Sequence, residues 1–158
     1  QKSEIKNERL NLNNIINESL SIARDDGYGE FHQVLNLQQD LPAVQANRTQ
    51  ILKVLVNLIK NAAEAMLIAG VPISTIIISV QTLAETNMAL VIVQDNGPGL
   101  DKDMAKRIFE PFFSTKPSGI GMGLAISRAL IETNGGQLWV DPDASQGAKF
   151  HFTLPYAS

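Results

Sequence analysis

Two asparagines, Asn57 and Asn61, lie four residues apart in a run whose apolar residues recur at helical spacing. Four residues is about one helical turn, so both amides project from one side of the helix. Their polar stripe could be a solvated helix face. However, asparagine costs about 0.6 kcal/mol relative to alanine inside a helix, and amide oxygens can meet a hydrated cation and its phosphates. Both interpretations stay open for the stripe, which consists of Gln50, Lys53, Asn57, Lys60, Asn61 and Glu64.

A carboxylate, Asp95, follows the strand-like run 89–94 and begins the turn Asp-Asn-Gly-Pro-Gly, which contains Gly97 and Gly99. Glycines allow a ligand to approach the backbone closely. The alternative is an Asn-Gly hairpin turn between two strands. Residues 101–104 favour a helix and not a returning strand, which weakens that alternative. The pattern therefore predicts a binding turn at the end of a strand.

A third candidate is the glycine-rich segment 119–124, Gly-Ile-Gly-Met-Gly-Leu, which opens a helix. Backbone N–H groups and the helix dipole at such a position can receive phosphate oxygens. The segment is no dinucleotide fingerprint, because the loop 113–118 precedes it in place of a strand, and the chain has no P-loop motif. A second glycine pair, Gly135 and Gly136, is interpreted more simply as a helix C-cap.

The elements that must position these residues follow from periodicity, caps and turns. Helical spacing runs from 15 to 22. We expect further helices at 50–69, 101–109 and 122–133, the first with a cap from Asn47 or Thr49 and an end at Gly70. Strands are expected at 34–41, 43–46, 75–83, 88–94, 137–141 and 148–154. Helices clustered with mostly antiparallel strands predict an α+β fold, a two-layer α/β sandwich with a mixed sheet covered by helices.

Composition excludes several other classes. The net charge of -3 and the lack of a basic run argue against nucleic acid as a partner. Cysteine is absent, which excludes disulfides and thiolate metal sites. The most apolar stretch, 51–69, is interrupted by polar residues, so it does not indicate a membrane span. We expect a soluble piece in which residues 1–9 end a linker and 10–158 form one domain.

Four segments, taken in order, resemble the histidine-kinase branch of the GHKL ATP-binding superfamily, which includes type II topoisomerases, MutL proteins and heat-shock chaperones. Residues 50–66, "QILKVLVNLIKNAAEAM", resemble the N box, and "DNGPG" at 95–99 the first glycine box. "FEPFF" at 109–113 resembles the F box, and "GIGMGLAISRALIETNGG" at 119–136 the second glycine box. The "PFFSTK" lid is similar to that of nitrogen-regulatory, oxygen-sensing and dicarboxylate-sensing kinases.

The resemblance implies a Bergerat ATP-binding fold, with ATP and Mg²⁺ as ligands. Asp95 would accept a hydrogen bond from the adenine amino group, and Asn61 would ligate magnesium with Asn57 and Lys60 on the phosphate side. We add Lys116 as a contact to the γ-phosphate, because a lysine is a mobile point charge; a solvated loop lysine is the alternative. The catalytic assignments are thus Asn57, Lys60 and Lys116. The remaining ATP-binding residues implied are Gly97, Gly99, Phe109, Phe112, Gly119, Gly121, Met122, Gly123 and Leu124.

Two positions depart from the family pattern. Asn134 stands where many relatives have histidine, which we expect to affect only the end of a helix. Ala148 stands where threonine is frequent, so a hydroxyl that holds a water near adenine would be missing.

The resemblance implies the catalytic domain of a bacterial two-component sensor histidine kinase. Hydrolysing relatives carry a glutamate four residues before the magnesium asparagine, whereas this chain has Asn57. A neutral imidazole needs no deprotonation, which favours histidine as acceptor. His32 and His151 lie in strand-like contexts, so the acceptor would be on a separate helical domain.

The alternatives are a nucleotide-binding scaffold without phosphotransfer and a GHKL ATPase. The expected partners are the helical dimerisation and phosphoacceptor domain and a response regulator. The piece itself would be monomeric and the full protein a homodimer. We expect a cytoplasmic location, with an inner-membrane anchor of the full protein as an open alternative.

Overall fold

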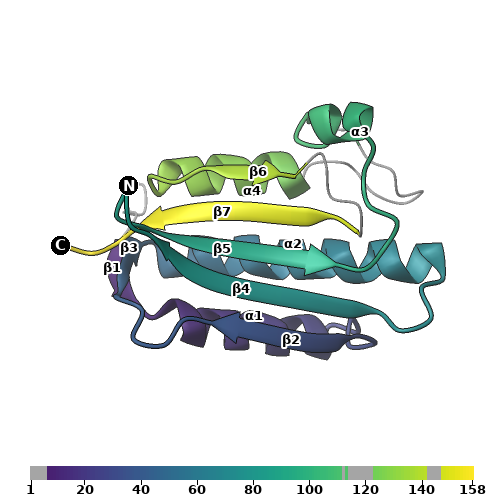
Figure 1. The fold of residues 1–158 in the computed structure, drawn as a ribbon, viewed down its shortest axis with the longest axis horizontal. Coiled ribbons are helices and arrows are strands. Elements are labelled where there is room, and N and C mark those ends of the chain that lie inside the picture. Colours follow the sequence, from purple (N-terminus) through teal and green to yellow (C-terminus); the bar gives the residue numbers. More distant parts are fainter. Residues whose placement is uncertain (1–6, 112, 114–122, 142–146) are drawn as a thin grey trace, which may run out of the picture.

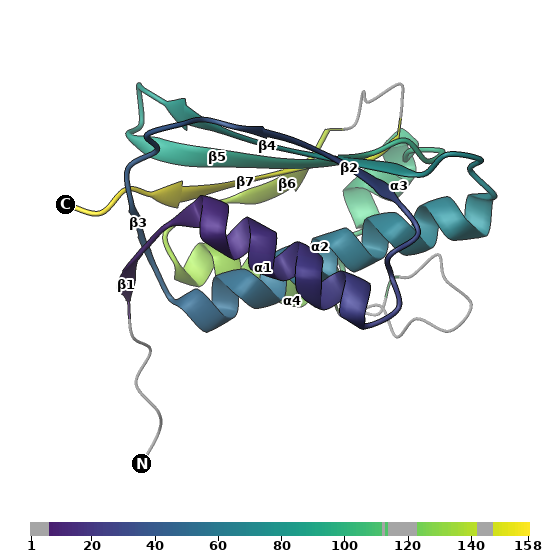
Figure 2. The same ribbon diagram turned by 90° about the horizontal axis from the view of Figure 1, so that it is seen from below.

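In the computed structural model of the chain, one five-stranded sheet carries its helices on a single face (Figure 1, Figure 2). The structure describes residues 7–111, 113, 123–141 and 147–158. The predictions for Phe112, Lys116, Gly119, Gly121 and Met122 therefore lie outside the described residues. No helix within the described ranges is both long and apolar enough to span a membrane.

The sheet has the strand order β2-β4-β5-β7-β6. Its strands are β2 (His32–Leu37), β4 (Thr75–Leu83), β5 (Met88–Asp95), β6 (Leu138–Val140) and β7 (Lys149–Pro155). Only β2 and β4 are parallel; the other neighbouring pairs are antiparallel. The predicted α+β sandwich with a mixed, mostly antiparallel sheet is confirmed. Strand β2 begins two residues before the expected range 34–41 and ends earlier, because the chain turns after it through Asp40 at a φ of 58°.

The helices on the covered face are α1 (Leu12–Asp25), α2 (Arg48–Ala69) and α4 (Gly123–Thr133). Every second residue of β4 and β5 faces them, and α2 lies in the middle with its apolar side buried against the sheet. The core includes Ile51, Leu55, Leu58, Ile76, Ile78, Val91, Ile131 and Phe152. The sheet and the three helices thus enclose one core that fixes where the polar residues of α2 point.

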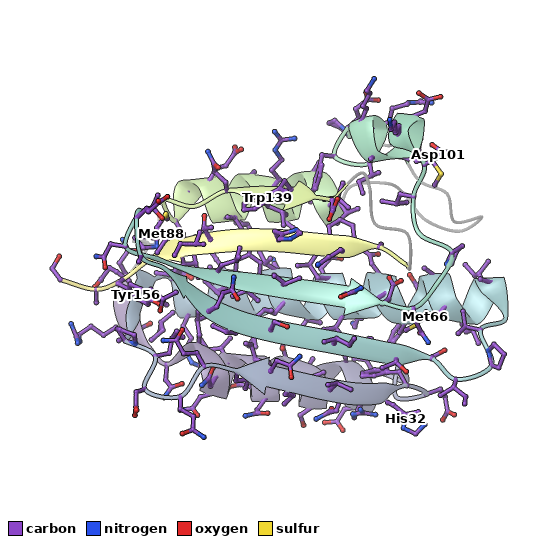
Figure 3. The ribbon with its side chains drawn as sticks, in the orientation of Figure 1. His32, Met66, Met88, Asp101, Trp139 and Tyr156 are labelled. Carbon is purple, nitrogen blue, oxygen red and sulfur yellow. The ribbon has the colours of Figure 1, made fainter. Side chains whose placement is uncertain are left out.

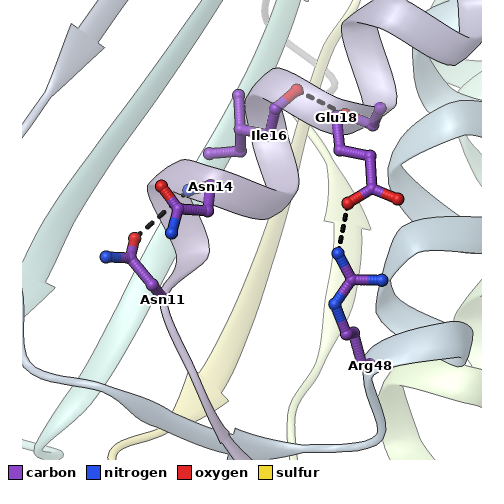
Figure 4. Close-up of polar contacts among 6 residues, drawn as sticks. Asn11, Asn14, Ile16, Glu18 and Arg48 are labelled. Carbon is purple, nitrogen blue, oxygen red and sulfur yellow. Dashed lines mark hydrogen bonds and ion pairs between the residues drawn. The ribbon is translucent and has the colours of Figure 1, made fainter.

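Side-chain caps and an ion pair fix the starts of the first two long helices. Asn11 caps α1 by accepting from the N–H of Asn14 at 3.1 Å, and Glu18 of α1 pairs with Arg48 in the first turn of α2 (Figure 4). Asn47 caps α2 as expected and accepts from the N–H of Gln50 at 2.9 Å. Helix α2 ends at Gly70, whose φ of 70° is readily adopted only by glycine.

A second, two-stranded sheet joins β1 (Glu8–Leu10) to β3 (Val44–Ala46), antiparallel. Residues 8 and 9, which the sequence assigns to a linker, thus belong to the folded part. Strand pairing uses backbone groups and needs no apolar residue, and the side chains of both residues are exposed. The described N-terminal part and the C-terminus lie at the same end of the molecule, where Ala157 donates to the carbonyl of Ala43 at 2.8 Å.

Candidate functional site

Asp95 lies at the end of β5 and is only 5% exposed. Its Oδ1 accepts two backbone hydrogen bonds, from the N–H of Gly97 at 2.9 Å and from the N–H of Ala148 at 3.1 Å. The backbone N–H of Asp95 donates in turn to the carbonyl of Ala148 at 3.0 Å. Within the described part of the chain, no donor reaches Oδ2. One oxygen is therefore fixed by the backbone, and the other keeps its capacity to accept.

Burial raises the pKa of Asp95, because the charged carboxylate loses hydration inside the protein. The hydrogen bonds from Gly97 and Ala148 oppose this and lower the pKa, but burial has the larger effect. A buried carboxylate that is costly to charge and only half satisfied by the protein is typical of a binding site.

Gly97 and Gly147 bring the backbone close to Asp95, and Gly99 packs against Gly147. A Cβ at Gly97 would stand 3.2 Å from Oδ1 of Asp95 and 3.4 Å from Cγ of Met66. Gly147 has a φ of 85°, and a Cβ there would stand 2.0 Å from the carbonyl oxygen of Asp95. Gly99, with a φ of 78°, lies directly opposite Gly147. Of the predicted pair, Gly97 thus lies at Asp95 together with Met66 of α2, which is labelled in Figure 3, and Gly99 lies against Gly147.

Asn96 fastens the turn that follows Asp95. Its Oδ1 accepts from the N–H of Thr75 at 2.8 Å, and its Nδ2 donates to the carbonyl of Ile73 at 2.8 Å. The chain then leads into α3 (Lys102–Arg107), capped by Asp101, and not into a returning strand. The hairpin interpretation of this turn is therefore wrong, and the prediction of a loop between a strand and a helix is confirmed.

Asn57 of α2 faces the first turn of α4. Its Nδ2 donates to Oγ of Ser127 at 3.0 Å, and a Cβ at Gly123 would stand 2.8 Å from its Oδ1. These contacts bring the N-box segment and the first residues of α4 together, although the two are distant in sequence. Asn61 follows one turn later on α2, and both asparagines are partly buried.

Lys60 lies on the same helix, but its side chain contacts residues at the end of α1 and not α4. Its Nζ pairs with Oδ2 of Asp26 at 2.7 Å and lies 5.4 Å from the ring centre of Tyr28. The Tyr28 hydroxyl donates to Oε2 of Glu64 at 3.2 Å, and the charge of Glu64 raises the pKa of Tyr28. The structure thus places Lys60 against the end of α1. The polar stripe of α2 is no simple solvated face, because only Lys53 among its six residues is exposed and the other five are partly buried.

Phe109 packs at the end of α3, where its ring meets that of Phe150 edge-on at 6.3 Å. The guanidinium of Arg128, on α4, lies 5.2 Å from the same ring centre. Leu124 packs against the common core. Helix α4, the start of β7 and the segment after α3 are therefore neighbours.

Asn134 does more than end a helix, contrary to the expectation from sequence. It is buried, its Oδ1 accepts from the N–H of Asn47 at 2.8 Å, and its Nδ2 donates to Oε1 of Gln50 at 2.8 Å and to the carbonyl of Leu130 at 2.7 Å. It thereby joins the end of α4 to the start of α2. The predicted C-cap is confirmed: Gly135 has a φ of 86°, and the N–H of Gly136 donates to the carbonyl of Ile131 at 3.0 Å.

Both histidines lie in strands, as expected. His32 is the exposed first residue of β2. His151 lies in β7 and stacks on Trp139 of β6, with ring centres 5.1 Å apart. Its Nδ1 is buried without a partner in the described structure, and burial lowers its pKa.

Sequence reasoning missed three contributors to the site: Ser127, Gly147 as a close neighbour of Asp95, and Asn96 as the fastener of the turn. The glycine that precedes a strand in "QGAKF" was the one signal available for Gly147. A serine in an apolar helical stripe gives no such signal, because its partner belongs to another helix.

The comparisons place the chain in a family. Residues 46–158 match the family described as histidine kinase-, DNA gyrase B-, and HSP90-like ATPase. Sensor protein TdiS of Thauera aromatica is 38% identical over 147 residues, 92% of this chain and 27% of that protein. Sensor protein FixL of Bradyrhizobium diazoefficiens is 46% identical over 114 residues, 72% of this chain and 22% of that protein.

A solved structure agrees with these relatives. The nucleotide-free catalytic domain of the histidine kinase ThkA has a TM-score of 0.82 at 30% identity and covers 96% of both chains. This chain spans about a quarter of the length of the curated relatives it matches. The chain therefore belongs to the histidine kinase-, DNA gyrase B-, and HSP90-like ATPase family, and its relatives within that family are sensor histidine kinases.

Proposed function

We propose that this chain binds ATP and transfers its γ-phosphoryl group to a histidine on a separate helical domain of a sensor histidine kinase. The observation that carries the proposal is the geometry of Asp95. Two backbone N–H groups occupy Oδ1, and Oδ2 keeps its capacity to accept at a glycine-walled turn. An exocyclic amino group such as that of adenine offers the donor that Oδ2 requires. Gly97 and Gly99 would line the base pocket beside Met66.

On the phosphate side we propose Asn57, Asn61 and the start of α4. The described residues contain no cluster of three His, Cys, Asp or Glu side chains that could hold a metal by itself. Amide oxygens on one helix fit a different arrangement, in which phosphates and water supply most ligands of Mg²⁺. We assign Asn61 as the protein ligand. When bound, Mg²⁺ would neutralise charge on the phosphate oxygens.

The remaining residues on this side have supporting roles in the proposal. Gly123 and Leu124 would receive phosphate oxygens at the N-terminus of α4, together with Gly119, Gly121 and Met122. Lys60 would have to leave Asp26 to reach a phosphate, and Lys116 would contact the γ-phosphate. Phe109 and Phe112 would support the segment that covers the nucleotide.

The transfer itself needs positioning more than a protein base. A histidine acceptor is neutral near pH 7 and already carries a lone pair, so no group has to remove a proton before attack. The residue four positions before Asn61 is the neutral Asn57, which holds the hydroxyl of Ser127 and has no carboxylate to activate water. This chemistry favours transfer to histidine over hydrolysis.

The proposed partners follow from this role. They are the helical dimerisation and phosphoacceptor domain of the full-length protein and a response regulator downstream. In this proposal, residues preceding β1 connect the two domains, the separate catalytic domain is monomeric, and the full protein is a dimer that works in the cytoplasm.

The test has two steps. Titration with a fluorescent ATP analogue and Mg²⁺ should show binding by this chain. The chain is then incubated with radiolabelled ATP, with and without the helical domain, followed by acid treatment. We expect slow labelling of the helical domain and none of the chain itself. The rate should rise with the concentration of the helical domain, because the encounter is bimolecular. The label should be lost in acid, because phosphohistidine is acid-labile.

Each of the other outcomes indicates a different function for the chain or contradicts the proposal. Acid-stable label on the chain alone would indicate a serine-directed kinase. Good nucleotide binding with no transfer to the helical domain would indicate a scaffold without phosphotransfer. Absence of any nucleotide binding would contradict the proposal altogether.

A further inference from the structure

Ser127 is a buried hydroxyl on the side of α4 that packs against α2. The residue is 3% exposed and lies one turn after Gly123 and one turn before the buried Ile131. Alanine would fill this position with better helix propensity and no polar group to satisfy. The hydroxyl therefore depends on its partner, which is Nδ2 of Asn57 at 3.0 Å.

The amide of Asn57 is held by two successive turns of α4. Gly123 and Ser127 are four residues apart and share one side of the helix. A Cβ at Gly123 would stand 2.8 Å from Oδ1 and 3.1 Å from Nδ2 of Asn57, so the amide lies directly against this glycine. The last torsion of an asparagine is soft, and without Ser127 the amide could rotate about it.

We propose that Ser127 is a positioning residue that holds the Asn57 amide with Oδ1 toward the phosphates and magnesium of the bound nucleotide. With Nδ2 donated to Ser127, the carbonyl oxygen is the end of the amide that attracts a cation or a metal-bound water. No described residue donates to that oxygen. Ser127 itself does not touch the nucleotide. This inference rests on the proposed function, in which Asn57 lies on the phosphate side.

Substitutions at Ser127 can separate the effect of its hydroxyl group from the effect of side-chain volume. Ser127→Thr and Ser127→Val have the same branched shape and differ only in a hydroxyl against a methyl group. Ser127→Ala removes the hydroxyl without adding volume, so it preserves the test if the branched residues do not fold. Ser19→Ala is the control, because Ser19 is fully buried on α1 and its hydroxyl donates to the carbonyl of Ile16 and not to Asn57.

The first measurement is the gain in affinity for the ATP analogue AMPPNP when Mg²⁺ is added. In Ser127→Val and Ser127→Ala, this gain should be about two- to tenfold smaller than in the wild type, which corresponds to the loss of one hydrogen bond. The affinity without metal should equal that of the wild type. Ser127→Thr and Ser19→Ala should keep the whole gain. General destabilisation would not separate Thr from Val in this way. In an Asn57→Ala background, the difference between Thr and Val should vanish.

The second measurement is the side-chain amide signal of Asn57 in a nitrogen–proton NMR spectrum, assigned by its loss in Asn57→Asp. It should keep its position in Ser127→Thr and move in Ser127→Val, even without nucleotide. If the wild type binds nucleotide more tightly with Mg²⁺, and Ser127→Thr and Ser127→Val agree in both measurements, this inference is overturned and the proposed function still stands. A wild type that binds no nucleotide would overturn the proposed function and this inference together.

Discussion

The N–H of Ala148 lies 3.1 Å from Oδ1 of Asp95, and the N–H of Asp95 donates to the carbonyl of Ala148 at 3.0 Å. This exchange joins the loop before β7 to the end of β5. Because a second N–H, from Gly97, also reaches Oδ1, the orientation of this carboxylate is set by the backbone. A substituted side chain must keep an acceptor at the Oδ1 position.

Asp95→Asn should abolish most nucleotide affinity without loss of stability. The two N–H groups would keep the amide oxygen at the Oδ1 position, so the amide NH₂ would face the adenine amino group, donor against donor. Loss of a hydrogen bond to a charged group corresponds to a roughly tenfold or greater rise in Kd. Burying a neutral amide costs less than burying a carboxylate, so the unfolding midpoint should not fall. Nucleotide titration and thermal melting check both, and unchanged affinity would contradict the assignment.

Gly147→Ala should damage both stability and nucleotide binding. A Cβ there would stand 2.0 Å from the carbonyl oxygen of Asp95, in a backbone with a φ of 85°. Gly27→Ala is the matched control, because Gly27 has a φ of 94° and open space around it. The control should lose only about 1–2 kcal/mol of unfolding free energy from strain, measured by urea unfolding, and keep its nucleotide affinity. Equal effects of the two variants would show that the contact with Asp95 is unimportant.

Local periodicity predicted the helices and strands because each element buries one face on a common core. Asp95 and Asn57 could be selected as candidates from the sequence, since each belongs to a short motif with fixed spacing. Ser127 and Asn134 were not, because their partners, Asn57 and Asn47, are 70 and 87 residues away in the chain. No periodic pattern records which two helices will pack together. The same holds for Lys60, whose pairing with Asp26 depends on where α1 ends.

Asn134→Ala should destabilise the domain by about 1–3 kcal/mol, the cost of leaving buried polar groups without partners. The N–H of Asn47 and the side chain of Gln50 would both lose the bonds that tie α2 to α4. Urea unfolding measures the loss. Thr133→Ala, one residue earlier and exposed, should change the unfolding free energy by less than about 0.5 kcal/mol. An Asn134 variant as stable as this control would show that the tie is redundant.

Hydrolysis of ATP by the isolated chain should be very slow, because no carboxylate occupies position 57. Phosphate release, followed over hours with excess Mg²⁺ and ATP, should stay far below that of a dedicated ATPase. Asn57→Glu places a carboxylate there, but the longer side chain must fit against Gly123 and Ser127, where the asparagine already fills the space. We therefore expect weaker nucleotide binding in this variant and no gain in hydrolysis. Rapid turnover by the wild type would favour an ATPase.

His151 should make the domain less stable in mild acid. Burial lowers its pKa below the ordinary value of 6.5, with the charge of Lys149 acting in the same direction and that of Asp141 opposing it. The unfolded chain then binds a proton at a higher pH than the folded chain does. The contribution of His151 to the free energy of unfolding is therefore fully present above about pH 6.5 and is lost as the pH falls through the folded pKa.

His151→Phe keeps a ring against Trp139 and removes the titration. Urea unfolding at several pH values should show a fall in stability with acid for the wild type and a smaller fall for His151→Phe. Comparing the two proteins at each pH removes the contribution of Asp95, whose raised pKa makes stability rise as the pH falls. Parallel pH profiles for the two proteins would show that the imidazole accepts its proton in the folded state without cost.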